Sequence, residues 1–280
     1  MRRFMIGGNW KMQILKVGEA VRIAESIANA LKNFSMVDVF IAPSFNALYS
    51  VGKAISKTKL KLASQNVHYH EQGAFTGEIS ILSCIDAGCD YIILGHSERR
   101  RIFGETNEII NQKVVKTLQN GLKPVLCIGE TAKERAEGRV KEVNQEQLTG
   151  SLKGVTQEQL GKVIIAYEPV WAINNKYLNP GVEIKPATPD QASETHAMVR
   201  DWFKQEYGDT CADQIPIIYG GSMNEKNATE LLKIKDIDGG LVGGASLTAE
   251  SFIPIIRSAE DLSKRDPEFK WDKNTLRFRD

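Results

Sequence analysis

Short, continuously apolar runs recur along the chain. Eight of them are typical of β-strands and cover residues 4–8, 37–42, 60–64, 91–94, 124–128, 163–167, 216–219 and 237–242. A half-exposed strand alternates apolar and polar side chains, whereas a strand covered on both faces is apolar throughout. The pattern therefore predicts eight strands buried on both faces, as in a parallel sheet.

The segments between these runs have the periodicity of helices. In the first segment, three- and four-residue steps define one apolar stripe at Val17, Val21, Ala24, Ala28 and Leu31. A later helix is expected to begin after Thr188. This residue is a suitable N-cap, Pro189 fits the first turn, and Gln191 can complete a capping box.

Regular alternation of strands and helices predicts parallel βαβ units. Eight such units in 280 residues predict one α/β domain, a closed (β/α)8 barrel without edge strands. We assign residues 1–265 to the barrel and 266–280 to a C-terminal extension, either part of the same domain or a surface tail. An open, doubly wound sheet is the alternative, but no Gly-x-Gly-x-x-Gly motif follows the first run.

The charge balance argues against polyanionic partners. The chain has 36 Lys and Arg residues and 35 Asp and Glu residues, so neither nucleic acid nor an anionic membrane is expected as a partner. No stretch approaches the ~20 apolar residues that span a bilayer, and the first residues do not resemble a signal peptide. An anionic substrate would have to be held by local groups.

The cysteines do not indicate a metal site. Cys84, Cys89, Cys127 and Cys211 form no Cys-x-x-Cys pair and do not alternate with histidine. They therefore predict neither a zinc site nor a disulfide framework. Free cysteines fit a reduced, cytoplasmic location best.

Polar residues follow several of the apolar runs. In an α/β barrel, active residues lie where the strands end and the next loops begin. Lys11 lies just after the first run, His96 after the fourth and Glu168 after the sixth, while Gly-rich turns follow the last two runs. Taken singly, these are a solvated lysine, a structural histidine, a surface carboxylate and tight turns. Their joint position on one rim favours an active site.

Six short segments resemble signatures of the triosephosphate isomerase family. In the family's order they are residues 8–12 (Gly-Asn-Trp-Lys-Met), 73–80 (Gly-Ala-Phe-Thr-Gly-Glu-Ile-Ser), 95–100 (Gly-His-Ser-Glu-Arg-Arg), 166–173 (Ala-Tyr-Glu-Pro-Val-Trp-Ala-Ile), 219–222 (Tyr-Gly-Gly-Ser) and 241–247 (Leu-Val-Gly-Gly-Ala-Ser-Leu). The resemblance spans nearly the whole barrel and implies the TIM-barrel fold. It also implies an aldose–ketose isomerase of glycolysis and gluconeogenesis that interconverts glyceraldehyde 3-phosphate and dihydroxyacetone phosphate through a cis-enediolate.

The resemblance implies catalytic roles that this chemistry requires. Glu168 matches the base that removes a proton from the carbon beside a carbonyl. His96 matches a neutral histidine that donates a hydrogen bond to the developing oxyanion, a pairing for which this family is itself the standard example. Lys11 adds a fixed positive charge and Asn9 a neutral donor. This proton transfer requires no metal or organic cofactor.

Supporting residues lie beside these four. Glu98 is expected to pair with Lys11 and orient it, and Ser97 to hold the base in the open site. The phosphate of a small sugar substrate is expected to lie against backbone amides near Ser222, Gly243 and Gly244, where glycine lets an anion approach the backbone closely.

The resemblance also implies a homodimer. In the family, the third loop of one chain inserts into the other near the catalytic lysine. The matching residues here are Gly73, Phe75, Thr76 and Gly77, with Thr76 the best candidate to reach the partner.

The chain departs from the family in the lid that follows residue 173. In place of a short Gly-Thr-Gly tip, residues 174–186 read Asn-Asn-Lys-Tyr-Leu-Asn-Pro-Gly-Val-Glu-Ile-Lys-Pro. A lid excludes water and shields the enediolate. Asn174 is the candidate for the tip amide that binds phosphate, and this assignment stays open.

The long lid leaves two substrates to weigh. A tolerated surface insertion would keep the three-carbon reaction, which we favour. A roomier lid would suit a four-carbon ketose phosphate of tetritol catabolism, L-erythrulose 1-phosphate or D-erythrulose 4-phosphate. A catalytically silent binding protein is a third hypothesis, and it predicts loss of a catalytic residue, yet Lys11, His96 and Glu168 are all present.

Overall fold

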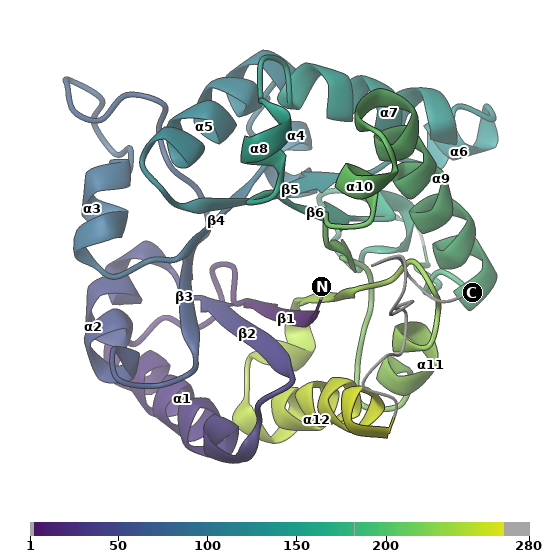
Figure 1. Cartoon of the computed structure of the whole chain (residues 1–280). Helices are drawn as coiled ribbons and strands as arrows, with labels where there is room; N and C mark the ends of the chain where they lie inside the picture. Colours follow the sequence, from purple (N-terminus) through teal and green to yellow (C-terminus); the bar gives the residue numbers. More distant parts are fainter. Residues whose placement is uncertain (1–2, 182, 266–280) are drawn as a thin grey trace.

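The computed structural model describes residues 3–181 and 183–265. Its strands form a closed barrel in chain order, and each strand is parallel to its neighbours (Figure 1). They are β1 Phe4–Asn9, β2 Val37–Ala42, β3 Lys61–Ser64, β4 Tyr91–Leu94, β5 Lys123–Ile128, β6 Ile164–Tyr167, β7 Ile217–Tyr219 and β8 Gly239–Val242. The predicted (β/α)8 barrel is confirmed. The predicted extension, 266–280, lies outside the described residues.

Helices surround the barrel. The longer ones are α1 Val17–Ala30, α2 Phe45–Ile55, α5 Asn107–Gln119, α7 Val140–Ser151, α9 Pro189–Tyr207 and α12 Ala249–Arg265. The shorter ones are α3 Ile81–Asp86, α4 Ser97–Arg101, α6 Ala132–Ala136, α8 Gln157–Leu160, α10 Asp209–Ala212 and α11 Ala228–Leu232, with 3-10 turns η1 Leu31–Asn33, η2 Val170–Ala172 and η3 Gly244–Ser246. No helix within residues 3–181 and 183–265 is long and apolar enough to cross a membrane.

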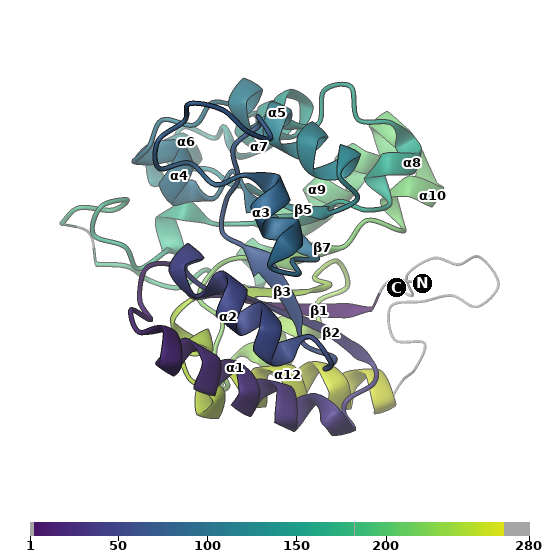
Figure 2. The same ribbon diagram turned by 90° about the vertical axis from the view of Figure 1, so that its left-hand side faces the viewer.

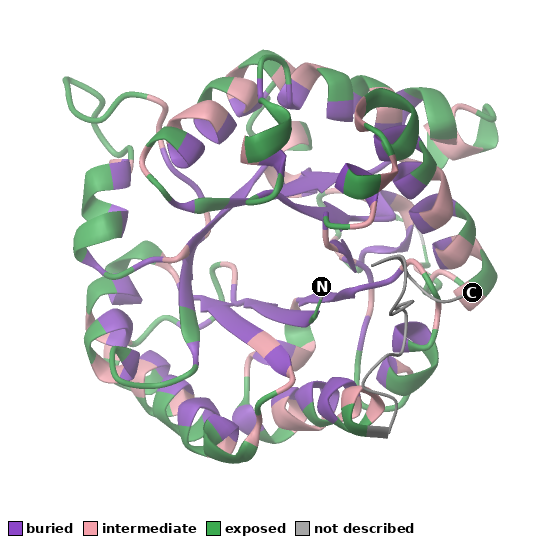
Figure 3. Ribbon diagram, viewed as in Figure 1, coloured by how far each residue is buried: buried purple, intermediate pink, exposed green. Residues whose placement is uncertain are grey.

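The strands are buried on both faces, which explains their continuous apolar character (Figure 3). In β6, for example, Ile164 and Ala166 belong to the cluster inside the barrel, whereas Ile165 and Tyr167 pack outward against the helices. The inner cluster is filled tightly. A Cβ at Gly7 would lie 2.1 Å from the ring of Phe40, so this position requires glycine.

The predicted helix signals are also present. Thr188 caps α9 by accepting a hydrogen bond from the Gln191 amide, and the Gln191 side chain accepts one from Thr188 in return. Ala24 and Ala28 of α1 are buried, while Val17 and Val21 are partly buried against the core. The sequence periodicity thus identified the faces that pack on the barrel.

Candidate active site at the carboxyl ends of the strands

Lys11 lies just beyond β1 in an uncommon backbone conformation. Its φ is +50°, and its amide donates to Oδ1 of Asn9 at 3.1 Å. The turn directs the ammonium toward α4, where Nζ contacts Oε1 of Glu98 at 2.8 Å. The predicted pairing of Lys11 with Glu98 is therefore found in the structure.

His96 lies between β4 and α4 and is buried. Its Nδ1 accepts a hydrogen bond from the Glu98 amide at 3.2 Å, as the N-cap of α4. A neutral ring that accepts at Nδ1 carries its proton on Nε2, an assignment that follows from the hydrogen-bond network. The Nε2 atom lies 2.9 Å from Oε1 of Glu168, so the histidine is positioned to donate from the side that faces the barrel mouth.

Glu168 follows β6 and is only 2% exposed. The Ser97 amide donates to its Oε2 at 2.8 Å, and the Ser97 hydroxyl donates to its Oε1 at 3.4 Å. The backbone at Gly220 packs closely against the Glu168 side chain, because a Cβ at Gly220 would lie 2.8 Å from Cγ of Glu168. With His96, Ser97 thus holds the carboxylate in a defined resting position.

These side chains face one cavity of about 360 Å³. Its lining brings together eight of the residues selected from the sequence: Asn9, Lys11, His96, Glu168, Asn174, Ser222, Gly243 and Gly244. Ser97 and Glu98 lie behind this lining and contact it through the hydrogen bonds described above. Strand ends that are far apart in the sequence therefore converge on a single space.

The far side of the cavity is formed by Ser222 and the Gly-rich turn after β8. The 3-10 turn η3 begins at Gly244, which is exposed and has open space where a Cβ would be. Backbone amides that begin a helical turn attract anions. Within residues 3–181 and 183–265, no group of three or more His, Cys, Asp or Glu residues could hold a metal ion.

Charge is concentrated on the Lys11 side of the cavity. Burial alone would raise the pKa of Glu98, but the positive charge of Lys11 and hydrogen bonds from Lys11 and Asn175 lower it below its usual value. Glu98 therefore stays ionised and keeps Lys11 oriented. Deep burial and the nearby Glu168 raise the pKa of the Cys127 thiol well above its usual value, which leaves Cys127 a neutral neighbour of the base.

Glu130 holds the start of the lid and was not anticipated from the sequence. It is fully buried and accepts hydrogen bonds from Tyr167 Oη at 3.0 Å and Trp171 Nε1 at 2.8 Å. Arg135 pairs with the same Oε1 at 3.1 Å, and Asn144 donates to Oε2 at 3.1 Å. A lone glutamate after β5 has no periodicity or motif to mark it, so only the fold reveals this anchor.

The lid itself is ordered by two asparagines. Asn179 donates to the carbonyls of Val170 and Ile173, at 2.8 and 3.0 Å. Asn175 reaches out of the lid and donates to Oε1 of Glu98 at 2.8 Å. The lid extends from the barrel end opposite the N-terminus (Figure 2).

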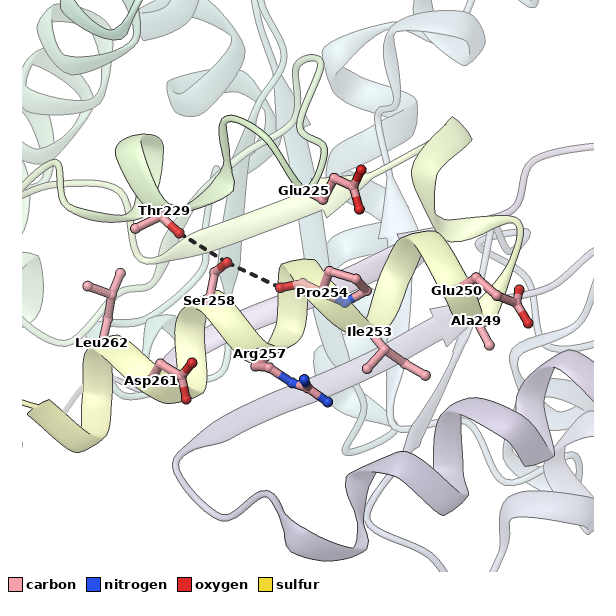
Figure 4. Close-up of a pocket in the computed structure, with 10 residues that line it drawn as sticks. All are labelled: Glu225, Thr229, Ala249, Glu250, Ile253, Pro254, Arg257, Ser258, Asp261 and Leu262. Atoms are coloured by element: carbon pink, nitrogen blue, oxygen red, sulfur yellow. Dashed lines mark hydrogen bonds between the residues drawn. The ribbon is translucent and has the colours of Figure 1, made fainter.

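A second hollow, of about 400 Å³, lies between α11 and α12 on the outside of the barrel (Figure 4). Its polar groups include Glu225, Glu250, Asp261 and Arg257. Across the two helices, Thr229 Oγ1 donates to Ser258 Oγ at 3.1 Å. It combines neither a histidine with a buried carboxylate nor strand ends with Gly-rich turns. The cavity at the strand ends is therefore the better candidate for catalysis.

The loop expected to contact a partner is exposed. Gly73 and Gly77 have φ values of +151° and +90°, which favour glycine, and Thr76 lies between them at the surface. Phe75 is 40% exposed and stacks on His70. A neighbouring cavity of about 340 Å³ lies beside Lys11 and is lined by residues that include Met12, Phe45, Gly77, Glu98 and Phe103.

The fold and the site together define a (β/α)8-barrel protein with a buried carboxylate–histidine pair, a lysine and a Gly-rich turn around one cavity. Comparison with known proteins agrees with this class. The model of the family described as triosephosphate isomerase matches residues 4–259, and the chain belongs to this family. It is 46% identical to the triosephosphate isomerase of Chloroherpeton thalassium over 261 residues, which cover 93% of this chain and 100% of the relative.

Two further comparisons agree. The triosephosphate isomerase of Endomicrobium trichonymphae is 43% identical over 257 residues, covering 92% of this chain and 99% of the relative. The crystal structure of triosephosphate isomerase from Bartonella henselae aligns with a TM-score of 0.80 at 34% identity, over 91% of this chain and 98% of that one. None of these names supports the four-carbon alternative raised by the long lid.

Proposed function

We propose that this protein interconverts glyceraldehyde 3-phosphate and dihydroxyacetone phosphate. The observation that carries the proposal is the convergence of Lys11, His96 and Glu168 on one cavity whose far side is a Gly-rich turn. A substrate anchored there by its phosphate would place its carbon chain toward the acid–base pair. The family membership supports the same reaction.

Each group has a step in the reaction. Glu168 removes a proton from the carbon next to the carbonyl, which leaves an enediolate, and it returns the proton to the adjacent carbon. His96 Nε2–H donates to the oxygen on which negative charge develops, and it exchanges that proton between the two oxygens as a neutral ring. Lys11 and Asn9 stabilise the charge, and the amides near Ser222, Gly243 and Gly244 bind the phosphate. This family is itself the standard example of the glutamate and neutral histidine pair.

The test of this function is an isomerase assay with purified protein. We expect kcat/KM for glyceraldehyde 3-phosphate above about 10⁵ M⁻¹ s⁻¹, within the usual range for enzymes acting on their own substrates. L-Erythrulose 1-phosphate serves as the comparison substrate. A thousandfold higher efficiency on the tetrulose phosphate, or no turnover of either substrate, would contradict the proposal.

We propose further that the protein acts as a homodimer in the cytoplasm, with residues 266–280 as an extension of a barrel domain that ends at 265. Apolar side chains in the lining of the cavity beside Gly77 are exposed, which favours a protein–protein contact. The exposed fractions are Met12 83%, Phe45 49% and Phe103 65%.

The substitution Thr76→Glu is expected to dissociate this dimer. The cavity that would receive it is lined by two acids and two cations, Glu78, Glu98, Lys11 and Arg99, so it offers no net positive charge to a buried carboxylate. A longer, charged side chain would therefore lose its hydration there without a compensating partner. Sedimentation should show the parent at twice the chain mass and the variant with a dimer dissociation constant raised more than about tenfold. Lys162→Glu, an exposed charge change away from the loop, is the matched control. A parent that sediments as a monomer at micromolar concentration would refute the dimer.

A further inference from the structure

One oxygen of Glu98 joins the lysine of the site to the lid. Lys11 Nζ and Asn175 Nδ2 each lie 2.8 Å from Oε1 of Glu98. The other oxygen, Oε2, lies 3.5 Å from Nδ1 of His96. The glutamate thus has a cation, a lid amide and the catalytic imidazole around it, and the lid amide and the cation share the same acceptor atom.

The direction of the Asn175 amide is fixed by its own surroundings. Its Oδ1 accepts a hydrogen bond from the Tyr177 backbone amide at 2.9 Å, so the NH₂ group must be the end that faces Glu98. The Asn175 carbonyl accepts from the amides of Leu178 and Asn179, at 3.1 and 2.9 Å. Asn175 is therefore the residue around which the first turn of the lid is built, and only its NH₂ group leaves the lid.

Asn179 provides a contrast within the same segment. Its side-chain amide donates to two carbonyls at the start of the lid, those of Val170 and Ile173. Asn179 orders the lid internally, whereas Asn175 ties the lid to the site. The two asparagines therefore separate the effect of lid order from the effect on the charged pair.

We propose that Asn175 is a positioning residue that couples the lid to the charge of Lys11 through Glu98. The amide takes part of the negative charge of Oε1, so the carboxylate pulls less strongly on the ammonium and Lys11 stays available to an anion in the cavity. The side chains of Lys11 and Glu98 are only 26% and 22% exposed, so solvent screens this three-way contact incompletely. Its effect on catalysis rests on the proposed function, whereas the contact itself does not.

A titration of Glu98 measures the coupling directly. The groups that face this carboxylate are Lys11 from the end of β1, His96 from the end of β4 and Asn175 from the lid. The side-chain carboxyl carbons of isotopically labelled glutamate are followed by NMR against pH, and the Glu98 signal is identified by its absence in Glu98→Gln. Asn175→Ala should raise the pKa of Glu98 by about half to one unit, because a donor to its charged form is lost.

Two further variants make this measurement decisive. Asn175→Asp should raise the pKa of Glu98 more than Asn175→Ala does, because a like charge then replaces the donor. Asn179→Ala should leave the pKa of Glu98 within about 0.2 unit of its value in the parent, since this substitution changes only contacts inside the lid. An unchanged pKa in Asn175→Ala, or an equal rise in Asn179→Ala, would overturn the proposal.

Inorganic phosphate serves as the probe of the cavity. Asn175→Ala should weaken phosphate binding about threefold. The loss is small because the missing hydrogen bond acts on phosphate only indirectly, through Glu98 and Lys11. In the Glu98→Gln background the same substitution should have no effect on phosphate binding, because the intermediary charge is gone. An equal loss in both backgrounds would show that Asn175 acts without Glu98 and would refute the coupling.

These measurements keep the inference separate from the enzyme assignment. Neither the Glu98 titration nor phosphate binding requires turnover, so both can be made on a protein that isomerises nothing. Turnover without a Glu98 shift would refute the role of Asn175 alone. A shift in the pKa of Glu98 without turnover would refute the proposed isomerase activity but would support the role of Asn175.

Discussion

Replacement of Glu168 by Asp is expected to lower kcat for glyceraldehyde 3-phosphate by about 10²-fold or more. The charge and the proton-accepting group are kept, but the carboxylate is withdrawn by one methylene. A misplacement of about 1 Å in a reacting group can cost this much. Steady-state kinetics measures the loss in kcat, and KM should change far less because the backbone amides proposed to bind the phosphate are untouched.

The geometry explains why the reach of Glu168 matters. At rest, its carboxylate accepts from the Ser97 amide at 2.8 Å and lies 2.9 Å from His96 Nε2. In the proposed reaction the carboxylate has to leave Ser97 and reach the substrate carbon, so the length of the side chain decides whether the proton can be transferred. Aspartate is too short to make both the resting contacts and the catalytic one.

The control is Glu158→Asp, which makes the same chemical change on the exposed helix α8 and should alter kcat less than twofold, in line with the small effects of surface changes. Thermal unfolding of both variants checks that the barrel is intact. Full activity in Glu168→Asp would mean that another residue is the base, and the assignment of the site would have to be abandoned.

The strands were predictable because burial on both faces leaves a continuous apolar signal. β2 and β4 have the predicted bounds, 37–42 and 91–94. The prediction for β8 began two residues early, at Ile237. This side chain is fully buried like a strand residue, but its amide donates to the Ile234 carbonyl in a turn. Burial alone therefore does not distinguish a strand from the turn that leads into it.

The site was predictable to the extent that it lies at strand ends. Lys11, His96 and Glu168 could be selected because the barrel fold brings those ends together. The contacts of Asn175 and Glu130 could not be selected, because each depends on how a loop without periodicity folds back on the site. Position in a regular element is encoded locally, whereas a contact between two loops is set by the tertiary structure.

A buried ion pair at the start of α5 yields the prediction with the largest effect on stability. Oε1 of Glu105 contacts Nζ of Lys113 and Nε of Arg99, each at 2.5 Å. Lys113 is 3% exposed, and its other partner is Oδ1 of Asn66, at 3.0 Å. Glu105→Ala leaves the ammonium buried beside a neutral amide, and removal of one member of a buried pair typically costs about 3–5 kcal/mol.

Denaturant unfolding at fixed protein concentration should show this loss, which is a large fraction of the ~5–15 kcal/mol that stabilises most domains. The matched variant is Glu105→Ala combined with Lys113→Met, which removes both charges. It should recover part of the lost stability, because Met fills the place of the Lys113 side chain and no unpaired charge stays buried. Arg99 is 28% exposed and can be solvated in either variant.

The pH dependence distinguishes a buried charge from a packing defect. Burial lowers the pKa of Lys113 below its usual value of 10.5, whereas the neighbouring Glu105 raises it in part. Removal of Glu105 should therefore lower the pKa of Lys113 further. Between the lowered pKa of the folded state and 10.5, the unfolded chain binds more protons than the folded one, so stability rises with pH through that window. The loss in the free energy of unfolding caused by Glu105→Ala should therefore become smaller between neutral pH and about pH 10. The double variant should not show this pH dependence. A deficit independent of pH, unrelieved by Lys113→Met, would identify a cavity rather than an unpaired charge as the cause.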